Sequence, residues 1–443
     1  MRFVKSVLLL MAVAGVSLLE VRAQQRTAQE PLPPQQVAVA PDGFRISLSV
    51  SPFTEMLLST GIAFTDGKET ARSPEELQRL FMKYGANEVY ARIATTRKHT
   101  IGFGDHSLDQ GLSRARMAHA LNLPLNPELG LFNIYGDIRC QPSPDFREYP
   151  ELKVPGLWTS LTLEQMLPIL QSYGAIVARM ILSTGAKVNV WDLGNEVELG
   201  MAGVAPHPLP AQCDDTAGGP GWYQPPDRVD PAIGKMSVLD LVKLPEPERI
   251  AWLQAHVWPN IARMFAAVAA GIRSVDPGAR FSTHVSGITA VLPAQAVAFY
   301  KAMKEGGFFP DELGFSFYPS SSDVPPHRLQ VFQETLTAVH AELGRPVFIA
   351  EFGYPAETVR EGGFSTWNHA LEKYPLTPQG QADLLRDLVA WGSGAGVSGI
   401  RPWAPELTVP GWMPFALFGL EGKTAVARPG LGAIAEGLRS RKP

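Results

Sequence analysis

The stretches Val190-Trp-Asp-Leu-Gly-Asn-Glu-Val197 and Val347-Phe-Ile-Ala-Glu-Phe-Gly-Tyr354 decide the fold of this chain. Each is a run of apolar, strand-forming residues that ends at a glutamate, Glu196 in the first and Glu351 in the second. A buried parallel strand with a carboxylate at its C-terminal end is typical of a (β/α)8 barrel, whose catalytic groups project from the strand ends into the mouth. The two stretches therefore predict strands four and seven of such a barrel.

The remainder of the chain alternates in the same way. Short runs rich in β-branched and aromatic residues are separated by helical patterns, which is the order expected of a parallel α/β fold. Eight strands with about eight helices favour a closed TIM barrel over an open doubly wound sheet. No helix opens with a GxGxxG or Walker pattern, which argues against nucleotide binding. The predicted strands cover residues 44–50, 88–93, 128–135, 188–193, 280–285, 312–317, 346–350 and 397–402.

Helix starts are visible in the sequence. Ser73-Pro-Glu-Glu76 and Thr162-Leu-Glu-Gln165 each place an N-cap residue three positions before Glu or Gln, at the start of an amphipathic run. A Pro- and Gly-rich insertion spans residues 200–246 after strand four. On a barrel it lies at the catalytic mouth, either as a substrate-binding loop or as a solvated excursion. Further helices are predicted over 108–122, 247–275, 293–305, 327–343 and 379–392.

The N-terminus has the pattern of an export signal. Arg2 and Lys5 precede an apolar stretch, residues 6–19, which is too short to span a bilayer, and small residues follow it. We predict a cleaved signal peptide over residues 1–23 and a flexible Pro/Gln-rich leader over residues 24–43. Residues 44–443 are then a single barrel domain. The mature protein is expected to be secreted or periplasmic, without membrane association.

Composition narrows the classes of partner. Of the 443 residues, 45% are hydrophobic and 19% are charged, which suffices for a large core. The formal net charge of −4 provides no basic footprint for nucleic acid. A neutral ligand such as a polysaccharide or oligosaccharide suits this balance better than a polyanion. We expect a monomer that needs no cofactor.

Two cysteines, Cys140 and Cys213, are present. Export would allow them to oxidise, and both follow predicted strands, so a disulfide and two free thiols remain equal alternatives. Neither cysteine has the CxxC or histidine spacing of a metal site. No metal is predicted.

Two carboxylates opposite each other in a barrel are the groups that glycoside hydrolysis needs. Strands four and seven face each other, so Glu196 and Glu351 are expected to meet, and a separation of ~5–5.5 Å would imply a retaining mechanism. Alternatively, Asn195 and Glu196 cap the next helix, and Glu351 is a salt-bridged carboxylate at the rim. Glu198 lies two residues further on and is expected to point elsewhere.

Other strand ends carry suitable partners for these glutamates. A fixed cation at Arg92 would hold a nucleophilic carboxylate ionised, unless it pairs with some other acid. Tyr318 is placed to donate a hydrogen bond to Glu351, and Trp403 to stack on a sugar ring. His284 is either a substrate-binding or a structural residue.

These motifs resemble a known family. Within the clan of (β/α)8 glycoside hydrolases that carry catalytic glutamates on strands four and seven, the chain most resembles the endo-β-1,4-galactanases of glycoside hydrolase family 53. The matching pieces are Leu193-Gly-Asn-Glu-Val-Glu-Leu-Gly-Met201, Leu313-Gly-Phe-Ser-Phe-Tyr-Pro319 and Glu351-Phe-Gly-Tyr-Pro355. The Gly200-Met201 pair is the most specific of them.

The resemblance implies that Glu196 is the acid/base and Glu351 the nucleophile, and that Asn195 binds the sugar 2-hydroxyl. It also implies retaining hydrolysis of a neutral plant β-glycan, with galactan first. Departures from the family pattern occur where the glycone is held, for example at Leu131–Asp137 and in the Ala-Pro405 that follows Trp403. Mannan, xylan and β-glucan therefore stay open as substrates. So do transglycosylation and a non-catalytic carbohydrate-binding barrel.

Overall fold

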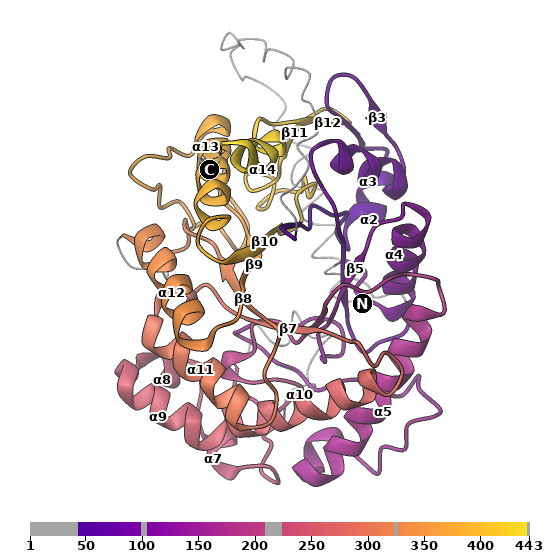
Figure 1. Cartoon of the computed structure of the whole chain (residues 1–443), viewed down its shortest axis with the longest axis vertical. Coiled ribbons are helices and arrows are strands. Elements are labelled where there is room, and N and C mark those ends of the chain that lie inside the picture. The colour runs from indigo at the N-terminus through magenta and orange to yellow at the C-terminus, as the bar shows by residue number, and fades with distance from the viewer. Residues whose placement is uncertain (1–42, 99–103, 209–223, 323–326, 441–443) are drawn as a thin grey trace. The chain divides into compact units, whose positions relative to one another are not determined.

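The computed structural model of the chain describes residues 43–98, 104–208, 224–322 and 327–440 (Figure 1). Its centre is an eight-stranded, all-parallel sheet. Strands form the inner ring in Figure 1, and helices lie outside them. In sheet order, the strands are β1 (Arg45–Ile46), β10 (Val397–Pro402), β9 (Val347–Phe352), β8 (Glu312–Phe317), β7 (Phe281–Val285), β6 (Trp191–Leu193), β5 (Leu125–Leu129) and β4 (Val89–Ile93).

Contacts between the segments of β1 and β4 close the ring. The backbone N–H of Asn87 donates to the carbonyl of Ile46 at 3.2 Å. The Asn87 side chain accepts from the Ile46 amide at 2.8 Å and donates to the carbonyl of Phe44 at 2.9 Å. The predicted (β/α)8 TIM barrel is thereby confirmed.

Five of the eight strands lie within two residues of their predicted bounds at both ends. β1 and β6 lie inside their predicted ranges, residues 44–50 and 188–193, but are shorter, and the third strand was predicted wrongly. β5 ends at Leu129, whereas the prediction covered residues 128–135. Asn126 and Pro127 are poor strand formers, so the strand escaped notice; its Asn126 side chain donates to the carbonyl of Val190 at 2.7 Å. Leu131 has φ +58°, which ends the extended run. Residues 131–137 are therefore a loop at the barrel mouth.

The helices follow their predicted caps. In α3 (Pro74–Lys83) the Ser73 side chain accepts from the Glu76 amide at 3.2 Å. In α5 (Leu163–Leu182) Thr162 and Gln165 form the predicted capping box. The other helices at predicted places are α4 (Leu108–Ala120), α11 (Pro293–Glu305), α12 (Arg328–Leu343) and α13 (Pro378–Gly392).

One predicted helix, residues 247–275, is two helices. α9 (Glu246–His256) ends before Val257, and α10 (Trp258–Arg273) begins after it. Pro259 explains the break, because proline lacks the N–H that would continue the helical ladder and crowds the carbonyl of the preceding turn.

A second, four-stranded sheet was not predicted. It runs in the order β11 (Phe418–Glu421), β12 (Thr424–Ala427), β2 (Ala63–Thr65) and β3 (Thr70–Ala71). These strands have two to four residues, too few for a clear alternation. The remaining elements are α2 (Thr54–Ser59), α7 (Pro231–Lys235), α8 (Val238–Lys243), α14 (Gly430–Arg439) and the 3-10 turns η2 (Trp158–Ser160), η3 (Val197–Leu199) and η4 (Thr289–Val291).

Several predictions concern residues outside the described part. These are the signal peptide 1–23, the leader up to residue 42, and residues 209–223 of the long insertion. Among the described residues, no helix is long and apolar enough to cross a membrane. Cys140 is disulfide-bonded, and the chain's other cysteine, Cys213, lies outside the described residues.

Candidate active site

Glu196 and Glu351 line one cavity of about 160 Å³, together with Tyr318 and Trp403. Glu351 stands near the C-terminal end of β9, and Glu196 follows β6 by three residues. The strand ends deliver both side chains to the mouth of the barrel, as predicted. The sequence motifs at β6 and β9 thus converge on a single site.

Glu351 is held as an ionised carboxylate. One oxygen accepts a hydrogen bond from Arg92, and the other accepts from the Tyr318 hydroxyl at 2.6 Å. Burial by itself raises the pKa of this carboxyl, but Arg92, with His284 and Tyr318, outweighs it and holds the pKa of Glu351 below the ordinary value. A charged carboxylate with no proton is the form that a nucleophile requires.

Glu196 has the opposite electrostatics. Burial raises the pKa of its carboxyl to about 8, with further contributions from Glu351, Asp137 and Glu198. The Ile138 amide donates to this carboxyl at a long 3.4 Å, which compensates little for the burial. Glu196 therefore keeps its proton at neutral pH. A protonated acid beside an ionised carboxylate is the division of roles on which glycosidases depend.

The backbone at Glu196 is in an unusual conformation. Its φ is +49° and its ψ +57°, in the left-handed region that costs a non-glycine residue on the order of 1 kcal/mol or more. This residue separates β6 from the turn η3. The sharp change of direction explains how Asn195, Glu196 and Glu198 come to face different surroundings.

Asn195 is fixed by three neighbours. Its side-chain oxygen accepts from Arg92 at 2.8 Å and from His284 Nε2 at 2.8 Å. Its side-chain nitrogen donates to the carbonyl of Gly136 at 2.7 Å. Arg92, Asn195 and His284 are all buried and do not line the cavity; they lie against the residues that do. Of the predicted substrate-binding residues, only Tyr318 and Trp403 reach the cavity surface.

Arg92 does more than hold Glu351. It also pairs with Glu128, with Nε to Oε1 at 2.5 Å, so both alternatives for this arginine hold at once. Trp403 covers the guanidinium at 4.2 Å from its ring centre. The arginine is thus clamped between two carboxylates and an aromatic face.

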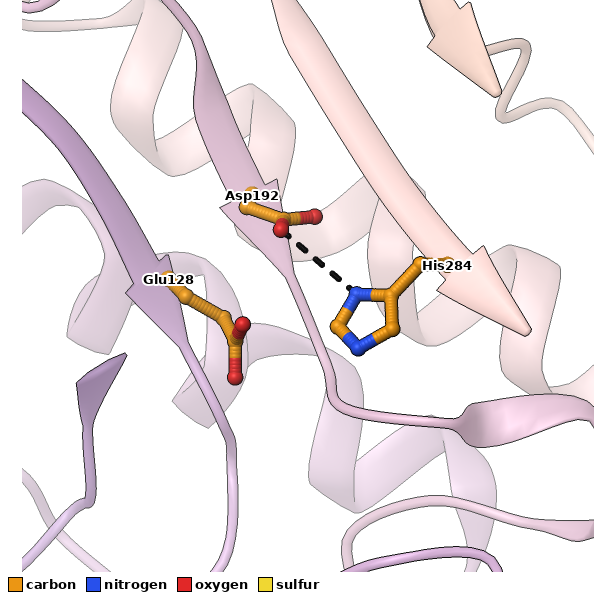
Figure 2. Close-up of side chains that lie close together, drawn as sticks. All are labelled: Glu128, Asp192 and His284. Carbon is orange, nitrogen blue, oxygen red and sulfur yellow. Dashed lines mark ion pairs between the residues drawn. The ribbon is translucent and has the colours of Figure 1, made fainter. Parts of the chain in front are cut away.

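Beneath this layer lies a buried group of Glu128, Asp192 and His284, which extend from neighbouring strands toward one another (Figure 2). His284 Nδ1 lies 3.5 Å from Asp192, which, against the effect of burial, raises the histidine pKa. Arg401 bonds Glu128 at 2.9 Å and Asp192 at 2.8 Å. Although the three residues could ligate a metal, Arg92 and Arg401 already supply the positive charge that two carboxylates require.

Glu198 points away from the cavity, as expected. Both of its oxygens accept from the Ser286 amide at 3.0 Å, and its side chain is fully buried. Burial raises the pKa of this carboxyl, although its hydrogen bonds oppose the shift. Glu198 anchors the loop after β7.

The sequence did not reveal several other cavity residues. Phe364, Trp367 and Trp412 form an aromatic wall beside Tyr318, whose ring lies 5.4 Å from Trp367 and 6.2 Å from Trp412. The loop after β5 contributes a further cavity residue, Arg139, which forms an ion pair with Asp137. All four residues stand in long loops, and the only signal in the sequence was the aromatic character of three of them.

The family model described as "Glycosyl hydrolase family 53" matches residues 68–414, well over half of the chain. No curated protein matches this chain.

Solved structures share the fold at low identity. A GH53 catalytic domain of Ignisphaera aggregans superimposes with a TM-score of 0.63 at 16% identity, covering 92% of this chain and 99% of that one. Fungal β-1,4-galactanases superimpose with a TM-score of 0.61 at 17% identity, covering 88% of this chain and 99% of that one. A xylanase 10C from Cellvibrio japonicus superimposes with a TM-score of 0.50 at 14% identity, covering 91% of this chain and 72% of that one. These likenesses support the barrel.

Proposed function

The chain belongs to glycosyl hydrolase family 53 and is a glycoside hydrolase, and from this premise we propose that it is a retaining endo-β-1,4-galactanase. One observation carries the catalytic part of the proposal. Two glutamates line a single cavity, and their surroundings move their pKa values in opposite directions, Glu196 upward and Glu351 downward. This pairing suits an acid/base and a nucleophile.

In the first step the Glu351 carboxylate attacks the anomeric carbon. The bond from that carbon to the glycosidic oxygen breaks, and the Glu196 carboxyl gives its proton to the departing oxygen. A glycosyl ester of Glu351 and a free leaving-group sugar result. In the second step Glu196, now a carboxylate, takes a proton from water as the water oxygen attacks the anomeric carbon. Glu351 departs as a carboxylate, and the anomeric configuration is retained.

The surrounding residues have roles that follow from their contacts. Arg92 and Tyr318 keep Glu351 charged and oriented through their two hydrogen bonds. The family resemblance assigns the sugar 2-hydroxyl to Asn195, but this side chain lies behind the cavity lining; its contacts with Arg92 and His284 give it the role of positioning Arg92. Trp403, which lines the cavity, would stack on the glycone.

Galactan is the proposed substrate because the family resemblance and the fungal β-1,4-galactanases of like fold point to it. Mannan, xylan and β-glucan are the competing substrates. Export is part of the proposal, since residues 1–23 have the pattern of a signal peptide. The mass of the N-terminal peptide of secreted protein tests it, and a start at Gln24 is expected.

The experiment that tests the function is release of reducing ends by the protein from Gln24 onward. The panel is galactan, arabinogalactan, mannan, xylan and β-glucan, with Glu196→Gln and Glu351→Ala as controls. Activity of the wild type alone on galactan, with oligosaccharide products, is the expected result. Activity on another polymer would overturn the galactan assignment. Binding without turnover on every glycan would instead favour a non-catalytic barrel.

A further inference from the structure

The cavity contains an ion pair that the proposed mechanism does not use. Asp137 and Arg139 both line it. Arg139 Nη2 donates to Asp137 Oδ2 at 2.9 Å, and the Arg139 amide donates to Asp137 Oδ1 at 2.8 Å. The carboxylate is nearly buried, with 10% of its side chain exposed, whereas 46% of the arginine side chain is exposed. A guanidinium has five N–H donors, and only one of them is committed to Asp137.

The loop that carries the pair is held firmly. The backbones of Asp137 and Cys140 pair with each other at 2.9 and 3.0 Å. The Gln141 side chain donates to the carbonyls of Asp137 at 3.0 Å and Asn195 at 2.7 Å. The loop is therefore tied to the residue immediately before Glu196. An arginine on such a support is preorganised, so little conformational entropy is lost when it binds a ligand.

The pair lies on the Glu196 side of the cavity. Ile138, between its two members, directs its amide toward Glu196 Oε2 at 3.4 Å. Asp137 and, more weakly, Glu196 raise the pKa of Arg139. Glu351, by contrast, contacts Tyr318, whose ring adjoins the aromatic wall of Phe364, Trp367 and Trp412. The cavity thus has a charged wall beside the acid and an aromatic wall beside the nucleophile.

This asymmetry has a consequence for substrate orientation. The acid must protonate the glycosidic oxygen, so the leaving-group sugar lies beyond that oxygen on the side of Glu196. We propose that the guanidinium of Arg139, held by Asp137, binds hydroxyl oxygens of the leaving-group sugar. The assignment rests on the proposed function, because it requires a glycosidic substrate cleaved with Glu196 as the acid.

The chemistry favours arginine for this task. Its planar fork presents parallel donors to two neighbouring hydroxyl oxygens, and a hydrogen bond from a charged donor is stronger than one between neutral groups. Loss of such a bond typically lowers kcat/KM by about 10- to 100-fold. The loss should appear only with substrates whose leaving group is a sugar.

The chain offers a matched control on the same loop. Arg147 pairs with Asp145 at the same two-residue spacing. The Arg147 amide donates to Asp145 Oδ1 at 3.0 Å, and Arg147 Nη2 donates to Asp145 Oδ2 at 2.6 Å. Arg147 lines a different surface groove, formed by residues 143–158. Arg147→Met therefore removes an ion pair of the same sequence spacing, although a more exposed and bidentate one, without touching the cavity.

The experiment compares Arg139→Met, Arg139→Lys and Arg147→Met with the wild type. Each is assayed on a β-1,4-galacto-oligosaccharide and on a nitrophenyl β-glycoside with the same glycone, whose leaving group carries no sugar hydroxyl. Arg139→Met should lose roughly 10- to 100-fold in kcat/KM on the oligosaccharide and less than about twofold on the nitrophenyl glycoside. Arg139→Lys should recover part of the loss, and Arg147→Met should match the wild type on both. Melting temperatures verify folding.

Three other outcomes would contradict the assignment. Equal losses on both substrates would place Arg139 in the catalytic machinery or the fold. No loss on either substrate would mean that the arginine does not contact the leaving group. A wild type that cleaves no glycan at all would overturn the proposed function, and the leaving-group assignment with it, and is recognised before any variant is made.

Discussion

Arg92 on β4 donates a hydrogen bond to Glu351 on β9, across the barrel interior and 259 residues away in sequence. Neither side chain has appreciable access to solvent, with exposures of 0% and 6%. A buried pair of this kind is strongly coupled, because little water screens the two charges. The pair is the physical reason why a buried carboxyl remains ionised, and it connects the site to the charged groups beneath it.

Replacing the nucleophile should abolish hydrolysis and allow chemical rescue. Glu351→Ala is expected to lower kcat by roughly four orders of magnitude or more. Azide should restore part of it by attacking the anomeric carbon from the vacated face, giving a glycosyl azide of inverted configuration that NMR identifies. Glu198→Gln, a buried carboxyl outside the cavity, is the control and should not respond to azide. Near-normal turnover by Glu351→Ala would reject its role.

The pH dependence of kcat/KM should be bell-shaped with a late alkaline limb. Activity falls as pH rises through about 8, because Glu196 then loses the proton that it must donate. Activity also falls at acid pH, as the pH drops through the lowered pKa of Glu351, because the protonated carboxyl cannot attack the anomeric carbon. In Glu196→Gln, assayed with a dinitrophenyl glycoside that needs no acid, the alkaline limb should vanish. Its persistence would assign that limb to another group.

Removing the cation beside the nucleophile should shift the acid limb upward. In Arg92→Met the burial of Glu351 is no longer opposed by its main positive partner, so its pKa rises and activity is lost at higher pH than in the wild type. A loss on the order of 100-fold in kcat/KM is expected at neutral pH. Arg114→Met is the control, since this buried arginine pairs with Glu55 away from the cavity. An unmoved acid limb would contradict the prediction.

The buried group of Glu128, Asp192 and His284, with its partner Arg401, should contribute to stability. Arg401→Met leaves Glu128 and Asp192 short of a buried partner and should cost about 3–5 kcal/mol in urea unfolding. Arg401→Met combined with Asp192→Asn should cost less than the sum of the two single changes. Exposed Arg147→Met should cost less than about 1 kcal/mol. Additive losses would mean that the pair is not coupled.

The same buried group predicts how the free energy of unfolding changes at acid pH. Burial raises the pKa of Asp192, but His284 and Arg401 outweigh it and hold the pKa below its unfolded value. The stabilisation is therefore complete above the ordinary aspartate pKa and is lost as pH falls below it. Asp192→Asn should flatten the dependence of unfolding free energy on pH in this acid range. An unchanged slope would exclude Asp192 as its source.

Local features of the fold were accessible to sequence reasoning. The strand ends at Glu196 and Glu351 stood out because a buried parallel strand is mostly apolar, and each of these two runs stops at a glutamate. The caps at Ser73 and Thr162 were recognisable because their partners lie three residues away. Where an irregular residue interrupts the pattern, as Pro127 does in β5 and Pro259 does between α9 and α10, the same reasoning failed.

The sequence by itself thus determined the barrel, its strand order along the chain and the two candidate glutamates. Tertiary structure alone decided which charges meet. Arg401 reaches Glu128 and Asp192, 273 and 209 residues away, and Arg92 bridges Glu128 and Glu351. Burial and Coulomb energy depend on distances in space between residues remote in sequence. For that reason only the folded chain distinguishes a protonated glutamate from an ionised one.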